Sequence, residues 1–167
     1  MAKNLELKTS VRSHIPYRKI LQEIGAGFRG IINQCDIYYK SPNGLLKLRL
    51  YEKEAELIQY NRDESGKTRW SNYEILKLDP VTASEFLEKL FKVETIVKKK
   101  RELWLFDNSR IHLDNVKNLG KFLEIETLVL NGNAEAKKRF NFIKDQLKLN
   151  SAEQILSSYR DLMLRKK

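Results

Sequence analysis

Charged and aliphatic residues alternate along several short stretches of this chain. The stretch from Asn4 to Lys8 reads Asn-Leu-Glu-Leu-Lys, and the stretch from Phe122 to Glu126 reads Phe-Leu-Glu-Ile-Glu. Successive side chains of a β-strand point to opposite faces of a sheet, so each stretch would place its charges on one face and its aliphatic groups on the other. A half-buried strand with its charges in water has the same pattern. The pattern predicts strands, and it leaves open whether their charges face bulk water or an enclosed interior.

This alternation, interrupted by turn signals, predicts eight strands. We expect them at residues 4–11, 34–39, 45–51, 54–62, 68–78, 94–106, 109–114 and 122–130. Amphipathic stretches predict four helices. Two of them cover residues 17–24 and 134–147, and the other two begin after Thr82 or Ser84 and at Ser151. Gln154, three residues after Ser151, completes the pattern of a capping box. Strands with inserted helices are typical of an α+β fold.

Several of the predicted strands carry both basic and acidic residues on one face. The charged positions are Lys47 and Arg49 in the third strand, Lys99 and Arg101 in the sixth, and Arg110, His112 and Asp114 in the seventh. An open sheet with one wet face would explain them. A closed sheet would also explain them, with charges in the lumen and the aliphatic face beneath the amphipathic helices.

Composition narrows the classes of function. The formal net charge of +10, from 32 Lys and Arg against 22 Asp and Glu, predicts an anionic partner. No apolar run approaches the roughly 18 residues that a membrane-spanning helix needs, so we expect no membrane partner. Cys35 is the only cysteine, which excludes an intrachain disulfide and favours a cytoplasmic location.

Eight segments resemble the CYTH superfamily, the triphosphate tunnel metalloenzymes, and they occur in that family's order. The segments are NLELK at 4–8, QCDIYY at 34–39, PNGLLKLR at 42–49, EAELI at 54–58, KKREL at 99–103, RIHLD at 110–114, LGKFLEIE at 119–126 and SYRDL at 158–162. They span nearly the whole chain and are most similar to the class IV adenylate cyclase-like branch. The resemblance implies one domain over residues 1–167: a closed eight-stranded antiparallel β-barrel, or tunnel, with a charged lumen and flanking helices.

The resemblance also implies roles for matching positions. The metal ligands, for Mg²⁺ or Mn²⁺, would be Glu6, Glu124, Glu126 and Asp114. The phosphate-binding residues would be Lys8, Lys47, Arg49, Lys99, Arg101 and Arg110, with Lys8, Arg49 and Arg110 also catalytic. His112 would either orient a phosphate or hydrogen-bond a tunnel carboxylate. The family's Lys-x-Arg spacing selects Lys99 and Arg101, and a shift of one position would select Lys98 and Lys100 instead.

One position departs from the family pattern. The family signature Glu-x-Glu-x-Lys begins here with Asn4, and a neutral amide is a weaker ligand than a carboxylate for a hard cation. The departure bears on whether a second metal ion is held.

The implied function is metal-dependent processing of ATP, thiamine triphosphate or inorganic triphosphate. A metal-activated water would make the protein a phosphohydrolase, and the 3′-hydroxyl of the substrate would make it a cyclase. One alternative is a catalytically weak polyphosphate- or nucleotide-binding module, which Asn4 favours. Another is a basic nucleic-acid-binding domain. It is disfavoured because only half of the run from Lys98 to Arg101 can point outward. A homodimer is compatible with the sequence.

Overall fold

The computed structural model describes residues 2–62 and 69–166, which form eight strands and four α-helices. The strands are β1 (Ala2–Ser10), β2 (Gly27–Tyr39), β3 (Leu45–Leu50), β4 (Ala55–Arg62), β5 (Arg69–Leu78), β6 (Val93–Phe106), β7 (Ser109–Val116) and β8 (Gly120–Leu128). The helices are α1 (Ile15–Glu23), α2 (Ala83–Leu90), α3 (Asn133–Gln146) and α4 (Tyr159–Arg165), and a 3₁₀ turn, η1, covers Ser151–Glu153. The predicted α+β class and the eight antiparallel strands are confirmed. No helix in the described part of the chain is both long and apolar enough to cross a membrane.

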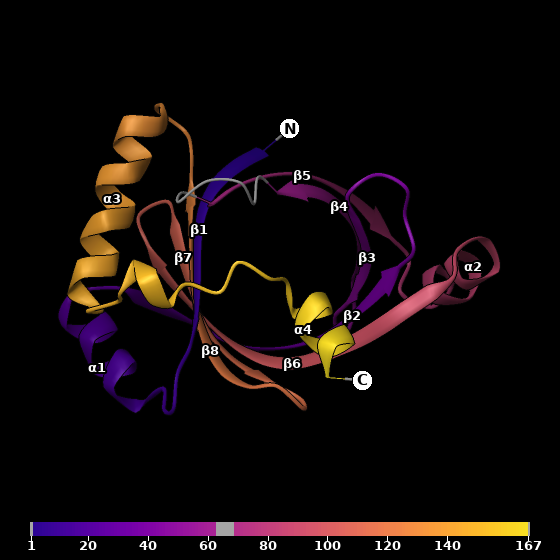
Figure 1. The fold of residues 1–167 in the computed structure, drawn as a ribbon, viewed down its shortest axis with the longest axis horizontal. Coiled ribbons are helices and arrows are strands. Elements are labelled where there is room, and N and C mark those ends of the chain that lie inside the picture. Colours follow the sequence, from indigo (N-terminus) through magenta and orange to yellow (C-terminus); the bar gives the residue numbers. More distant parts are fainter. Residues whose placement is uncertain (1, 63–68, 167) are drawn as a thin grey trace.

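The strands pair in the order β1-β5-β4-β3-β2-β6-β7-β8, and β1 also pairs with β8. Each strand pairs with two neighbours, and every described pairing is antiparallel. Figure 1 shows the strands arranged around a central space, with α1 and α3 together on one side and α2 on the other. The segment after α3 crosses in front of the ring and ends in α4.

On β1, β7 and β8 the aliphatic face points outward and packs against α1 and α3. Leu7 of β1 and Ile125 of β8 pack in the same buried cluster as Phe140 and Ile143 of α3 and Leu21 of α1. Burying one such side chain contributes roughly 1.5–3 kcal/mol, so this packing fixes which face of each strand lies against the helices. The charged face must then point into the ring, since a slip of one residue would exchange the two faces.

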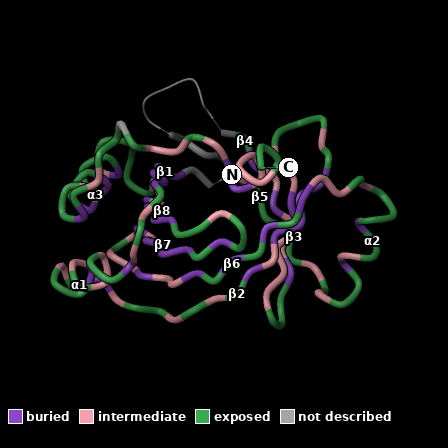
Figure 2. Tube along the Cα trace, turned by 60° about the horizontal axis from the view of Figure 1, so that its bottom comes forward, coloured by how far each residue is buried: buried purple, intermediate pink, exposed green. Residues whose placement is uncertain are grey.

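Figure 2 shows the consequence along β6, where buried and exposed residues alternate. Lys99 and Arg101 are buried, whereas Lys98 and Lys100 are exposed. The first half of β2 differs, because most of its residues are exposed or half-buried (Figure 2).

Strand β2 begins seven residues before its predicted start. A bulge lies between Phe28 and Gly30, and Gly30 has a φ of +117°. Residues other than glycine rarely adopt this backbone conformation, so the glycine permits the bulge. The bulge interrupts the alternation of polar and apolar residues, which is why the sequence pattern did not predict this half of the strand.

The prediction that the last helix opens at Ser151 was wrong. Ser151 begins only the short turn η1, and α4 starts at Tyr159. The capping box forms at Ser158, whose hydroxyl accepts a hydrogen bond from the backbone N–H of Asp161, while the Asp161 carboxylate accepts one from the N–H of Ser158. Both sites carry a serine followed three residues later by a side chain that can complete the box, and sequence spacing alone does not separate them.

Candidate phosphate- and metal-binding tunnel

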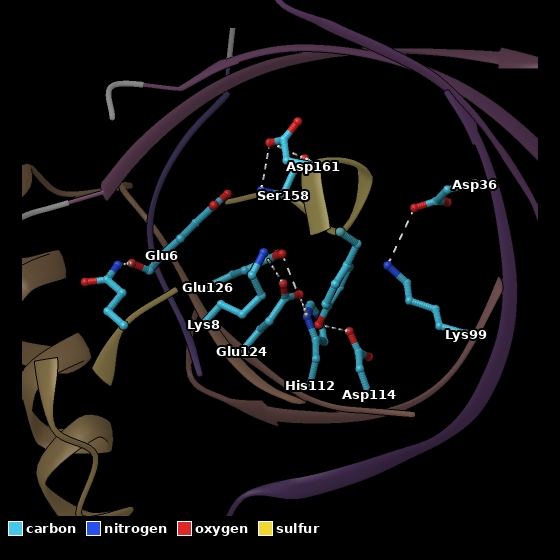
Figure 3. Close-up of polar contacts among 12 residues, drawn as sticks. Glu6, Lys8, Asp36, Lys99, His112, Asp114, Glu124, Glu126, Ser158 and Asp161 are labelled. Atoms are coloured by element: carbon cyan, nitrogen blue, oxygen red, sulfur yellow. Dashed lines mark hydrogen bonds and ion pairs between the residues drawn. The ribbon is translucent and has the colours of Figure 1, made fainter. Parts of the chain in front are cut away.

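A cavity of about 260 Å³ lies inside the ring of strands. It is lined by all six predicted phosphate-binding residues and by three of the four predicted metal ligands: Lys8, Lys47, Arg49, Lys99, Arg101, Arg110, Glu6, Glu124 and Glu126. Figure 3 shows charged side chains from opposite walls pointing toward one another across this space. The structure therefore brings together residues that lie more than 100 positions apart in the sequence, and it places Lys99 and Arg101, rather than Lys98 and Lys100, on the cavity wall.

Three potential metal ligands meet on one side of the cavity. Ligand atoms of His112, Glu124 and Glu126 all lie within 4.8 Å of one another. The Nδ1 atom of His112 is 3.7 Å from a carboxylate oxygen of Glu124 and 3.7 Å from one of Glu126. The register of β7 and β8 produces this group, because it sets His112 opposite Glu124 and Arg110 opposite Glu126. The sequence indicated that His112 faces inward, but it did not identify the histidine as a member of a ligand group.

The protonation states of this group suit a cation. Burial and then Arg101 lower the pKa of His112, which favours the neutral imidazole. Burial opposes ionisation of Glu126, yet His112, Arg110 and Arg101 outweigh it and lower the pKa of Glu126 to about 2. The pKa of Glu124 also lies well below its ordinary value, since His112, Arg101 and Lys8 outweigh the effect of burial. Ionised carboxylates and a neutral imidazole are the forms that bind metal.

Asp36 holds three of the basic residues in place. Its fully buried carboxylate accepts hydrogen bonds from Arg49 Nε at 2.7 Å, Arg49 Nη2 at 2.8 Å and Lys47 Nζ at 3.2 Å. Lys99 Nζ lies 3.5 Å from the same carboxylate. Burial would raise the pKa of Asp36, but these three cations outweigh it and keep the pKa well below its usual range. Asp36 was not among the residues predicted from the sequence, although it shares a strand face with Gln34 and Tyr38, which line the cavity.

Asp114, predicted as a metal ligand, is absent from the cavity lining and from the His112–Glu124–Glu126 group. It is fully buried and accepts hydrogen bonds from Arg101 Nε at 2.7 Å and Arg101 Nη2 at 2.5 Å. The Tyr159 hydroxyl donates a third hydrogen bond, at 2.9 Å. These contacts occupy both carboxylate oxygens and hold Arg101, which also reaches Glu124 at 2.7 Å. Glu6 lines the cavity from β1, opposite Glu126 in the strand register.

The inner wall is balanced in charge. Among the described residues, its lining has six basic side chains, the predicted phosphate-binding set, and four acidic ones: Glu6, Glu56, Glu124 and Glu126. Two buried carboxylates directly behind the lining, Asp36 and Asp114, pair with its cations and bring the acidic side chains to six. Asp36 and Glu56 add two carboxylates to the four that were predicted as metal ligands. A triphosphate, with about four negative charges, would therefore enter a wall with no formal excess of positive charge, and a divalent cation entering with it would offset about two of those charges.

Helix α4 completes the wall. Ser158 and Tyr159 line the cavity, and Figure 3 shows the helix beside the charged groups. Lys8 Nζ lies 4.5 Å and Lys99 Nζ 5.0 Å from the centre of the Tyr159 ring. These cation–π contacts help to hold both amines at the cavity.

Asn4 lies in the same wall at the position where the family signature has a glutamate. It is buried, and its side-chain oxygen has no hydrogen-bond partner among the described residues. Buried polar atoms normally have one, so this oxygen is available to a ligand.

Comparisons with known proteins agree with this fold. Residues 2–159 match the CYTH domain. The PH1012 protein of Pyrococcus horikoshii is 25% identical, with a TM-score of 0.82 over 95% of this chain and 98% of its own. A candidate adenylate cyclase from Vibrio parahaemolyticus is 19% identical, with a TM-score of 0.80 over 96% of this chain and 97% of its own. The candidate adenylyl cyclase HpAC1 of Hippeastrum is 13% identical, with a TM-score of 0.72 over 99% of this chain and 96% of its own.

The two candidate cyclases are less than 25% identical to this chain, so their structural similarity shows a shared fold. No curated protein matches the chain. The CYTH match covers nearly the whole chain and includes every strand of the ring. The chain belongs to the CYTH domain family.

Proposed function

We propose that this protein is a metal-dependent enzyme that breaks a phosphoanhydride bond of a triphosphate held inside the ring of strands, which acts as a closed tunnel. The observation that carries the proposal is the cavity itself, where six basic side chains face the His112–Glu124–Glu126 group. A structural neighbour, the Hippeastrum candidate cyclase, has a dominant triphosphatase activity, which supports the same class of reaction. The proposal treats residues 1–167 as one domain, because α4 contributes to the cavity that the strands form. The cytoplasmic location and the homodimer stay predictions from the sequence.

The proposed metal is Mg²⁺ or Mn²⁺, and the residues fit it. Glu124 and Glu126 would bind the ion, with His112 beside both and Glu6 on the neighbouring strand β1. When bound, the metal would neutralise phosphate charge and lower the pKa of a water molecule. Asp114 would act by holding Arg101 rather than as a ligand, since its oxygens are already hydrogen-bonded.

The basic residues would bind and orient the phosphates. Phosphoryl transfer depends mainly on positioning and on neutralising charge. Lys8 and Arg110 lie beside the carboxylates, with Lys8 Nζ 3.8 Å from Glu124 and Arg110 Nη2 3.0 Å from Glu126. They would contact the phosphate nearest the metal. Arg49, held by Asp36, would bind the other end of the triphosphate.

We favour hydrolysis over cyclisation. The cavity of about 260 Å³ is smaller than the roughly 300–1,000 Å³ of pockets that enclose a whole drug-sized ligand. It suits a triphosphate group, whereas cyclisation would require the ribose to reach the reacting phosphate inside the same space.

A catalytically weak binding module is the second candidate function. It is favoured by Asn4, whose neutral amide occupies a position where the family pattern has a carboxylate. Such a module would bind triphosphates without cleaving them.

The test is product analysis. The purified protein is incubated with inorganic triphosphate, thiamine triphosphate or ATP, each with Mn²⁺, Mg²⁺ or EDTA. We expect metal-dependent release of phosphate. Cyclic AMP with pyrophosphate would establish cyclisation, and tight binding without turnover would establish the module.

The site assignment is tested by Glu126→Gln, which we expect to lower turnover by at least about 100-fold. Glu23→Gln, at an exposed position on α1, is the matched control and should leave turnover unchanged. Full turnover in the Glu126 variant would overturn the assignment.

A further inference from the structure

Among the described side chains, the excess positive charge does not lie in the tunnel. Its lining, together with Asp36 and Asp114 directly behind it, has equal numbers of acidic and basic side chains there and contributes nothing to the formal net charge of +10. Part of it lies on the outer face of the sheet, where Lys98 and Lys100 of β6 are exposed. Lys117 is also exposed and donates its backbone N–H to the carbonyl oxygen of Lys98 at 2.9 Å, which places it beside Lys98.

These three lysines line a groove with a volume of about 780 Å³. Asn33 and Asn115 lie opposite Lys100 on the neighbouring strands and add amide groups to the lining. Within the described residues, Lys98, Lys100 and Lys117 form no ion pair, and the acidic member of the groove lining is Glu52. The groove is therefore a basic surface that lacks the balancing carboxylates of the tunnel.

The groove adjoins the tunnel. Strand β3 pairs with β2 only as far as Cys35, so the wall between these two strands ends there. Gln34 and Tyr51, at this end of the wall, line both the tunnel cavity and the groove. A ligand that leaves the tunnel at this point would pass directly onto the lysines.

We propose that the groove binds the continuation of a phosphate chain whose end lies in the tunnel, so that the substrate is a linear polyphosphate longer than a triphosphate. This rests on the proposed function of the tunnel. Hydrolysis of the terminal anhydride would add one water across the P–O–P bond, releasing one orthophosphate and a chain shorter by one phosphate.

The groove lining favours a bare phosphate chain over a nucleic acid. Lysine ammonium groups bind phosphate as compact point charges. Grooves for single-stranded nucleic acid add aromatic side chains on which the bases stack. Tyr51 is the aromatic residue that the described lining offers, and its hydroxyl donates to Glu56 at 2.9 Å. The groove thus supplies charge and amides and little stacking surface.

The experiment compares two triple variants that lose the same charge. The test variant is Lys98→Gln/Lys100→Gln/Lys117→Gln. The control is Lys137→Gln/Lys138→Gln/Lys148→Gln, at exposed positions in and just after α3. Each protein is titrated by calorimetry with inorganic triphosphate and with long-chain inorganic polyphosphate, in EDTA and at several salt concentrations. The quantity compared is the affinity ratio between the long and the short chain.

We expect the test variant to lower this ratio by about tenfold and the slope of log affinity against log salt by about 2, because three phosphate contacts are lost. The control variant should keep both within about twofold of the unmodified protein. Equal losses in the two variants would mean that net charge alone attracts the chain, and the proposal would be overturned. Tighter binding of a single-stranded oligonucleotide of equal charge, lost in the test variant, would assign the groove to nucleic acid and overturn it as well.

A turnover assay with Mn²⁺ separates this proposal from the function of the tunnel. Shortening of the long chain supports both. Lysine-dependent binding without shortening of any phosphate chain would refute the proposed enzyme and the substrate role, while leaving a polyphosphate-binding groove. Turnover of inorganic triphosphate without lysine-dependent binding of the long chain would refute the groove alone.

Discussion

The two faces of strand β6 carry the same kinds of residue in different surroundings. Lys99 and Arg101 point into the tunnel, where Asp36 and Asp114 pair with them. Lys98 and Lys100 alternate with them along the strand, and they are exposed and form no ion pair within the described part of the chain. Four consecutive basic residues thus divide into two pairs with different roles. The total charge of the run does not predict this division, whereas the alternation of the strand does.

The difference has an energetic consequence. Inside, each ion pair is buried, and removing one partner leaves a charge without compensation in a medium of low polarity. Outside, water solvates each ammonium group, and a substitution alters the free energy of unfolding little. Substitutions on the two faces should therefore differ strongly in their effect on stability.

The largest effect is expected at Asp36. Asp36→Asn would leave the charges of Lys47, Arg49 and Lys99 without their common carboxylate and should lower the free energy of unfolding by about 3–5 kcal/mol. Urea denaturation measures this loss. Asp145→Asn, at a side chain that is 71% exposed, is the matched control and should change stability by less than about 0.5 kcal/mol. A loss below about 1 kcal/mol at Asp36 would show that the inner wall tolerates unpaired cations.

The role of Asp36 also shows where prediction from sequence ends. Alternation predicted the strands and which residues share a face, because both follow from a period of two along each strand. The inward direction of the charged face came from the family resemblance. Asp36 stands between Cys35 and Ile37, and its partners Arg49 and Lys99 come from strands β3 and β6. Which carboxylate meets which cation depends on the strand register, and one sequence does not state the register. The bulge at Gly30 was missed for a related reason, since it breaks the period on which the prediction relied.

Acid should lower the stability of the protein mainly by protonating the carboxylates of the inner wall. Glu126 has a pKa of about 2 in the folded protein, below the ordinary value of about 4.3 expected in the unfolded chain. The stability contributed by its ionised form is therefore fully present above about pH 4.3 and is lost as the pH falls toward about 2. Asp36 and Glu124, whose pKa values are also lowered, act in the same direction.

We expect the loss from Glu126 alone to be on the order of 3 kcal/mol across this window, measured from urea midpoints at pH 5 to 2. In Glu126→Gln the pH dependence should be shallower by that amount. An identical dependence in the two proteins would place the acid-sensitive groups elsewhere.

A smaller effect is expected where α4 meets the wall. Tyr159→Phe removes the hydrogen bond from the Tyr159 hydroxyl to Asp114 and keeps the ring that packs beside Lys8 and Lys99. The loss of stability should be about 1–2 kcal/mol, since the acceptor is a buried carboxylate. Tyr17→Phe, at a half-buried tyrosine of α1, is the control and should change stability by less than about 0.5 kcal/mol. Equal effects at the two sites would show that the hydroxyl contact contributes nothing to the attachment of α4.

The smallest effect is expected on the outer face of β6, and it completes the comparison between the two faces. Lys100→Gln removes a solvated charge that has no ion-pair partner in the described structure, so the free energy of unfolding should change by no more than about 0.5 kcal/mol. Arg101→Gln, one residue further, removes the partner of Asp114 and Glu124 and should cost about 3–5 kcal/mol by the same measurement. Comparing the losses in free energy of unfolding at these two neighbouring positions directly tests the difference between the two faces of β6. Similar losses at both positions would mean that the lysines of the outer face are structural, and their assignment to a ligand-binding groove would lose its basis.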